Sequence, residues 1–142
     1  MTVRLILEAK GRDVVTLEPT ATMSDAVRTL ATKRIGALIV VHPDGGVAGI
    51  LSERDVVRMI GTDGPDCLSR AIGEVMTAKV ITCSEETTVE EAMEMMTRGR
   101  FRHIPVCVDG HLVGIISIGD VVKRRIEDAE REASHMREYI TG

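Results

Sequence analysis

The stretch Gly49-Ile50-Leu51-Ser52-Glu53-Arg54-Asp55 is matched 65 residues later by Gly114-Ile115-Ile116-Ser117-Ile118-Gly119-Asp120. In both stretches a glycine and two aliphatic residues end an apolar segment, and Ser-x-x-Asp follows as a helix start. The pair belongs to a longer duplication, in which Val14–Val57 aligns with Val80–Val122. A duplication on this scale predicts two copies of one structural unit.

Each copy is predicted to fold as strand, helix, strand, strand and helix. Thr22 and Thr88 each precede an acidic residue by three positions, which is a capping box at a helix start. The predicted strands cover 14–16, 37–41, 47–51, 80–82, 104–108 and 112–116. A unit of about 45 residues is too small to hold a core alone. We therefore expect a mixed α/β (α+β) fold, in which two βαββα repeats pack through their sheets with pseudo-twofold symmetry.

Three segments are expected along the chain. Residues 3–66 hold the first repeat with an N-terminal helix and a linker, and 67–125 hold the second repeat. Residues 126–142 form a helical tail, in which the apolar side chains continue a heptad seam. That seam comprises Val122, Ile126, Ala129, Ala133, Met136 and Ile140. The tail either folds back on its own domain or forms a dimer contact, and its length beyond the repeat favours a homodimer.

Composition excludes several classes of function. The net charge is −4, and the 142 residues include one Phe, one Tyr and no Trp, so we expect no nucleic-acid partner. No apolar stretch approaches the ~20 residues of a membrane span. The N-terminus lacks the apolar core of a signal peptide, so we expect no membrane partner and a cytoplasmic location.

The sequence also offers no catalytic constellation. It contains no phosphate-binding Gly-x-x-x-x-Gly-Lys, no dinucleotide-binding Gly-x-Gly-x-x-Gly and no nucleophile elbow. Cys67, Cys83 and Cys107 lack zinc spacing, and no two histidines have the spacing of ligands on one helix. We therefore expect neither an enzyme nor a metal site.

The Ser-x-x-Asp pattern has two interpretations. Serine at the N-cap and aspartate at the third helical position make an ordinary helix start. Duplication of the whole pattern favours ligand binding instead. A strand-end hydroxyl at a helix N-terminus can contact a phosphate or sugar oxygen, and a carboxylate can accept both hydroxyls of a ribose. Gly49 and Gly114 would let a ligand or another backbone come close.

The duplicated Gly-h-h-Ser-x-x-Asp frame (h, hydrophobic) resembles a tandem pair of cystathionine-β-synthase-type (CBS) domains, also called a Bateman module. The resemblance covers about Val3–Arg125, and it includes Glu74–Thr77, Arg34–Val41 and Arg102–Val106. It implies a non-catalytic regulatory module that senses AMP, ADP, ATP, NAD(H) or S-adenosylmethionine in clefts between the repeats. Such a module would signal to an unidentified protein target by a conformational or oligomeric shift. The alternative is an interaction and dimerisation scaffold without a ligand.

The resemblance also implies that each cleft joins the base pocket of one repeat to the Ser-x-x-Asp of the other. One cleft would use Val15, Ile35, Gly36, Ala37, Arg102, His103, Ser117, Gly119 and Asp120. The other would use Ile81, Phe101, Arg102, His103, Ser52, Arg54 and Asp55.

The implied roles follow residue type. The aspartates would hold ribose, the serines would contact the sugar-phosphate side, and Arg54, Arg102 and His103 would meet phosphate. His103 could equally be a satisfied core histidine, and Arg34 and Arg100 are interpreted first as charges that stabilise helix C-termini. Because the two copies differ at these positions, the clefts are expected to differ in affinity.

Overall fold

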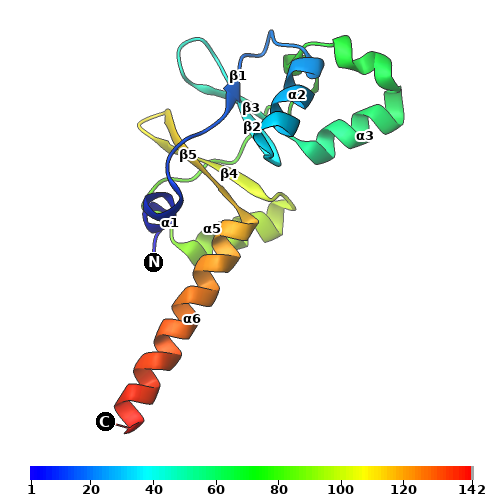
Figure 1. The fold of residues 1–142 in the computed structure, drawn as a ribbon. Coiled ribbons are helices and arrows are strands. Elements are labelled where there is room, and N and C mark those ends of the chain that lie inside the picture. The colour runs from blue at the N-terminus through cyan, green and yellow to red at the C-terminus, as the bar shows by residue number, and fades with distance from the viewer. Residues whose placement is uncertain (142) are drawn as a thin grey trace.

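The computed structural model describes residues 1–141, in which two small sheets face one another with helices around them (Figure 1). The first sheet has the order β1 (Thr16–Leu17), β2 (Ala37–Val41), β3 (Val47–Ser52), with β1 parallel and β3 antiparallel to β2. The second sheet pairs β4 (His103–Val108) with β5 (His111–Ser117) in antiparallel register. The helices are α1 (Val3–Lys10), α2 (Met23–Lys33), α3 (Glu53–Asp63), α4 (Ile72–Val75), α5 (Val89–Gly99) and α6 (Ile118–Thr141), with a 3-10 helix η1 (Pro65–Ser69). This arrangement confirms the duplicated mixed α/β fold.

The first strand of each repeat is smaller than predicted. In the first repeat it lies at Thr16–Leu17 rather than at 14–16. In the second repeat the strand expected at 80–82 reduces to a single bridge between Cys83 and Val106. Cys83 donates its N–H to the Pro105 carbonyl, and Cys107 donates its N–H to the Cys83 carbonyl. The short pairing leaves residues 79–81 without a β-partner, and all three line the cavity described below.

The short helices that precede each repeat pack into the other repeat. Val3, Ile6 and Leu7 of α1 belong to the core of the second repeat, although α1 precedes the first. Cys67 and Ile72 belong in the same way to the core of the first repeat. The exchange ties the two repeats into one unit, whereas the segment boundaries at 66/67 and 125/126 stay a prediction.

Helix α6 packs only at its beginning. Val121 is fully buried in the second core, but every residue from Ala129 to Thr141 is exposed, and the helix projects away from the sheets (Figure 1). The interpretation in which the tail folds back onto its own domain is therefore wrong. Gly142, the last residue of the expected tail, lies outside the described residues. Among residues 1–141, none of the helices has both the length and the apolar character to cross a membrane.

Candidate functional site

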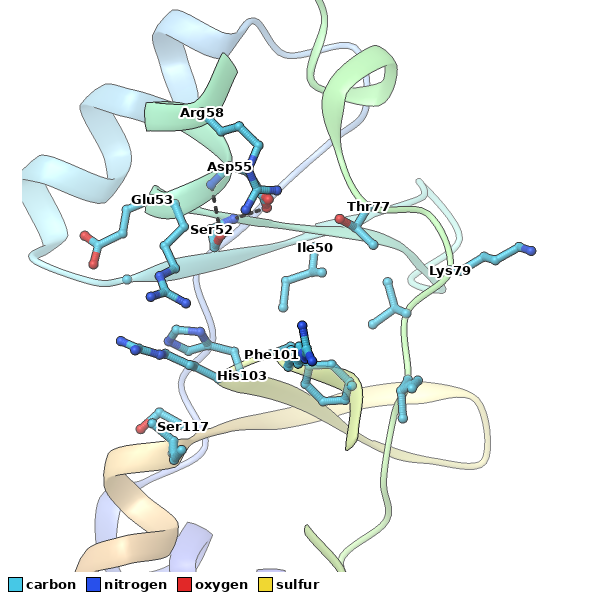
Figure 2. A pocket seen from close by; sticks show the side chains of 18 of the residues that line it. Ile50, Ser52, Glu53, Asp55, Arg58, Thr77, Lys79, Phe101, His103 and Ser117 are labelled. Atoms are coloured by element: carbon cyan, nitrogen blue, oxygen red, sulfur yellow. Dashed lines mark hydrogen bonds between the residues drawn. The ribbon is translucent and has the colours of Figure 1, made fainter. Parts of the chain in front are cut away.

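A cavity of about 640 Å³ lies between the two repeats (Figure 2). All seven residues predicted for the cleft that contains Asp55 line it: Ser52, Arg54, Asp55, Ile81, Phe101, Arg102 and His103. Of the nine residues predicted for the other cleft, Gly36, Arg102, His103, Ser117 and Gly119 line the same cavity. Val15, Ile35, Ala37 and Asp120 do not line it. The cavity therefore contains the whole of one predicted cleft and part of the other, and the binding role of each residue stays a prediction.

The strand-to-helix junction Ser52–Asp55 opens onto this cavity. The Ser52 hydroxyl accepts the Asp55 N–H at 3.2 Å, and the Asp55 Oδ2 accepts the Ser52 N–H at 3.0 Å. These bonds confirm the helix-capping interpretation of the motif. They occupy only one carboxylate oxygen, because within residues 1–141 no protein group donates a hydrogen bond to the Asp55 Oδ1. Capping and ligand binding are therefore compatible at this junction.

The equivalent junction Ser117–Asp120 has the same caps, at 3.2 Å and 2.8 Å, but it is closed by a lysine. The Lys10 ammonium donates to the Asp120 Oδ2 at 2.7 Å and to the Ile115 carbonyl at 3.0 Å. Asp120 consequently lines a separate recess of about 110 Å³ beside Lys10. Burial alone would raise the pKa of Asp120, but the hydrogen bonds from Lys10 and Ser117 outweigh it and lower the pKa below its ordinary value.

His103 connects the two repeats at the cavity wall. It pairs with Ser117 across the second sheet, and a Cβ on Gly36 of the first repeat would lie 3.3 Å from its ring. Burial lowers the pKa of His103, and the charge of Lys10 lowers it further. Glu53 and Asp120 act in the opposite direction, and Arg102 adds to the lowering. His103 is therefore a half-buried, uncharged imidazole at neutral pH, and not a residue of the closed core.

The cavity carries an excess of positive charge. Five cationic side chains line it, against the two carboxylates Glu53 and Asp55: Arg54, Arg58, Lys79, Arg100 and Arg102. None of the five forms an ion pair with an acidic residue of the described chain. A concave surface lined by unpaired cations attracts anions.

Two of these cations were missed from the sequence. Arg58 lies four residues after Arg54 on α3, so helical spacing could have found it. Lys79 lies in the extended segment between α4 and α5, where no periodicity signals its orientation. Arg34 and Arg100 are the C-cap residues of α2 and α5, which is the position expected of charges at helix C-termini, and both have a left-handed backbone with φ of 54° and 56°. Arg100 nevertheless also lines the cavity.

Apolar side chains of both repeats also line the cavity: Ile50, Val80, Ile81, Phe101 and Ile118. Gly99 positions the aromatic member, because a Cβ at this residue would overlap the Phe101 ring. No local pattern pointed to Gly99 as a site residue, since a glycine near a helix end is common for other reasons.

The described residues contain no cluster of three or more His, Cys, Asp or Glu side chains that could hold a metal ion. The three cysteines are free thiols. Burial raises the pKa of Cys83 to about 12, so this thiol is not a nucleophile at neutral pH.

Comparison with known proteins identifies the family. The model of the CBS domain matches residues 9–62 and 72–127, so the chain belongs to the CBS domain family as a tandem pair. It is 41% identical over 125 residues to the mitochondrial CBS domain-containing protein CBSX3 of Arabidopsis thaliana, covering 85% of this chain and 61% of that protein. A crystal structure of a CBS-domain-containing protein from Agrobacterium tumefaciens superposes with a TM-score of 0.84 at 46% identity, covering 87% of this chain and 92% of that one.

The chain spans less than two thirds of the curated relatives that it matches first, 61% of the Arabidopsis protein and 22% and 24% of the next two. A further crystal structure, the CBS domain pair of protein MJ0100 in complex with 5′-methylthioadenosine and S-adenosyl-L-methionine, has a TM-score of 0.80 at 23% identity. It covers 90% of this chain and 98% of that one, and it shows the shared fold. The compartment of the present chain stays a prediction.

Proposed function

We propose that this CBS domain pair is a non-catalytic regulatory module that binds an adenine nucleotide in the cavity between its repeats. The observation that carries the proposal is the composition of that cavity. It joins an open Ser-x-x-Asp junction, apolar lining residues and five unpaired cations in one space of about 640 Å³. A base, a sugar and a phosphate chain need these three kinds of surface in succession.

Each part of a nucleotide has a partner of matching chemistry. The Asp55 Oδ1 is an available acceptor for a ribose hydroxyl. Arg54 and Arg58 project from one face of α3 and present guanidinium groups, which pair well with phosphate oxygens. Ile81 and Phe101 are apolar residues of the lining, against which a flat base would replace water. AMP, ADP, ATP and NAD(H) share these features, and MJ0100, with the same fold, holds adenosine-containing ligands.

Calorimetry with AMP, ATP and NADH tests the proposal. At least one ligand is expected to bind the wild type, and Asp55→Ala should weaken it about 10- to 150-fold, because a hydrogen bond to a charged group contributes roughly 1.5–3 kcal/mol. Asp55→Asn keeps an oxygen for the helix cap but loses the charge, and should also weaken binding. Asp13→Ala, an exposed aspartate outside the cavity, is the matched control. Failure of all three ligands to bind the wild type would overturn the proposal.

The ligand would act by a population shift. A nucleotide that contacts α3 of the first repeat and β4 of the second favours the arrangement of repeats that it bridges, by no more than its differential affinity. That shift would reach an unidentified protein target through the surface of the module. Hydrogen exchange of the residues around His103 and Gly36, with and without ligand, should show increased protection across this contact.

We further propose that the module is a homodimer, as the heptad seam suggests. Val57 and Val122 occupy equivalent positions on α3 and α6, and are 71% and 41% exposed. Ile60 and Ile126 extend the two exposed faces. Apolar side chains at equivalent sites of both repeats suit a partner with the same twofold character.

Sedimentation analysis tests the dimer. Val57→Glu together with Val122→Glu should convert the dimer to a monomer, whereas Glu130→Lys on the exposed tail should leave it unchanged. Dimerisation without binding of any nucleotide would favour the scaffold alternative, for which the exposed tail residues Met136, Tyr139 and Ile140 are the supporting observation. A monomeric wild type would overturn the dimer proposal.

A further inference from the structure

We infer that the Lys10 ammonium takes the place of a ligand at the Ser117–Asp120 junction and is the occupant of that junction. Each chain would then bind one nucleotide, with its sugar at Asp55. The inference rests on the proposed function and deepens it. It assigns a role to a residue of the exchanged helix α1, and it explains why the aspartate of one motif lines the cavity and the aspartate of the other does not.

The Lys10 ammonium pairs with the carboxylate to which a sugar hydroxyl would donate, and it neutralises the charge of that carboxylate. It is 2.7 Å from the Asp120 Oδ2, the oxygen that also accepts the Ser117 N–H at 2.8 Å. Its second bond, 3.0 Å to the Ile115 carbonyl, holds it against the last strand of the repeat. The two side chains of the ion pair retain 34% and 23% of their exposure, so a ligand would have to displace a partly desolvated ion pair.

The first repeat has no such occupant. The residue equivalent to Lys10, 66 positions along the chain, is Met76. Its thioether packs against Gly49 instead of reaching the aspartate. The hydrogen bond to the strand carbonyl is made there by the backbone, because Thr77 donates its N–H to the Ile50 carbonyl at 3.0 Å. Within residues 1–141, Asp55 forms no ion pair.

The occupant is held by a fixed element. Lys10 is the last residue of α1, and Val3 and Leu7 of that helix are fully buried in the second core. Leu7 lies over Gly114, which has no side chain in its way. The ammonium therefore reaches Asp120 from an anchored helix, and its local concentration at the carboxylate far exceeds that of a dissolved ligand.

Lys10→Met, which copies Met76, tests the inference by calorimetry with ATP. The wild type is expected to bind one ATP per chain, and Lys10→Met two. Lys10→Arg keeps the positive charge and should keep one site. Lys33→Met, at an exposed lysine on α2, is the matched control and should also bind one.

The double variant Lys10→Met/Asp55→Asn locates the new site. It should retain one ATP, and adding Asp120→Asn should remove it. If Lys10→Met still binds one ATP, and that binding is lost in the double variant, Lys10 is not an occupant and the inference is overturned. If the wild type binds none but Lys10→Met binds one, the assignment of ribose to Asp55 fails while Lys10 remains the occupant. Absence of binding to both proteins overturns both proposals.

A ligand-free readout separates occupancy from a merely structural role. Titration of His103 by NMR should give a higher pKa in Lys10→Met than in the wild type, because the Lys10 charge that lowers it is gone. The Lys10→Arg variant should keep the wild-type titration. An unchanged His103 titration in folded Lys10→Met would contradict the position assigned to the ammonium.

Discussion

The junctions Ser52–Asp55 and Ser117–Asp120 have the same motif and the same capping bonds, yet only the aspartate of the first lines the cavity. The difference comes from the segment that crosses each strand end. Thr77 exchanges two backbone hydrogen bonds with Ile50 of the first strand, whereas Lys10 bonds to the second strand and to Asp120 through its ammonium. A local motif thus specifies how the helix starts, and the segment that packs beside it decides whether the motif is available to a ligand.

The largest expected effect comes from the exchanged helix that carries Lys10. Leu7 is fully buried, so Leu7→Ala should lower the free energy of unfolding by about 2–5 kcal/mol through lost burial and the cavity left behind. Urea unfolding measures the loss. Glu8→Ala on the exposed face of α1 should change it by less than about 0.5 kcal/mol. Equal effects would show that α1 does not anchor the second junction.

The equivalent glycines should differ in their tolerance of a methyl group. A Cβ at Gly49 would lie 2.8 Å from the Thr77 carbonyl oxygen, which is held by its own strand contact, whereas a Cβ at Gly114 would lie 2.7 Å from the flexible tip of Leu7. Gly49→Ala should therefore lower the free energy of unfolding by about 2–3 kcal/mol, and Gly114→Ala should lower it by about 1 kcal/mol. Both values are within the range for overpacked sites. Urea unfolding of the two variants measures both. The reverse order would mean that the backbone at Thr77 moves aside more easily than the Leu7 side chain.

Removing the two serine N-cap hydroxyls should distinguish their effect on stability from their effect on nucleotide affinity. Ser52→Ala and Ser117→Ala each lose an N-cap acceptor, and each should cost about 1 kcal/mol of stability. Nucleotide affinity should fall in Ser52→Ala and stay unchanged in Ser117→Ala, because only the first junction is proposed to hold the ligand. Thermal unfolding and calorimetry on the same samples provide the comparison. A loss of affinity in Ser117→Ala alone would reverse the proposed assignment.

The smallest effect concerns His103, whose equivalent in the first repeat is Ala37. The pKa of His103 in the folded protein is below its ordinary value of 6.5, so the unfolded chain binds more protons as the pH falls below 6.5. Stability should therefore decrease as the pH is lowered through this range, by at most about 1.4 kcal/mol per pH unit for one proton. Urea unfolding between pH 8 and 5 measures the slope. His103→Gln should remove this contribution, and an unchanged slope would contradict it.

Much of the fold was predictable because it depends on local patterns. The duplication, the capping residues at Thr22 and Thr88 and the apolar strands indicated the order of elements, and the helices begin where those caps lie. The strand expected at 80–82 was wrong in extent, because pairing over so short a segment depends on the neighbouring strand rather than on its own residues.

The site was predictable in part for the same reason. Ten of the residues that line the cavity were predicted from the repeat and its resemblance to the CBS family, and Arg58 follows Arg54 by a helical step. Lys79, from an extended segment, and Gly99, beneath an aromatic ring, have no local pattern that would reveal their neighbours.

The sequence by itself determined that the chain is a duplicated CBS pair with two capped Ser-x-x-Asp helix starts, because hydrophobic periodicity and capping are short-range properties. Only the tertiary structure decided that α1 crosses into the second repeat, that Lys10 meets Asp120 across 110 residues, and that Asp55 lines the cavity whereas Asp120 does not. Those contacts depend on how the two cores pack, so they cannot be inferred from the residues that neighbour each position along the chain.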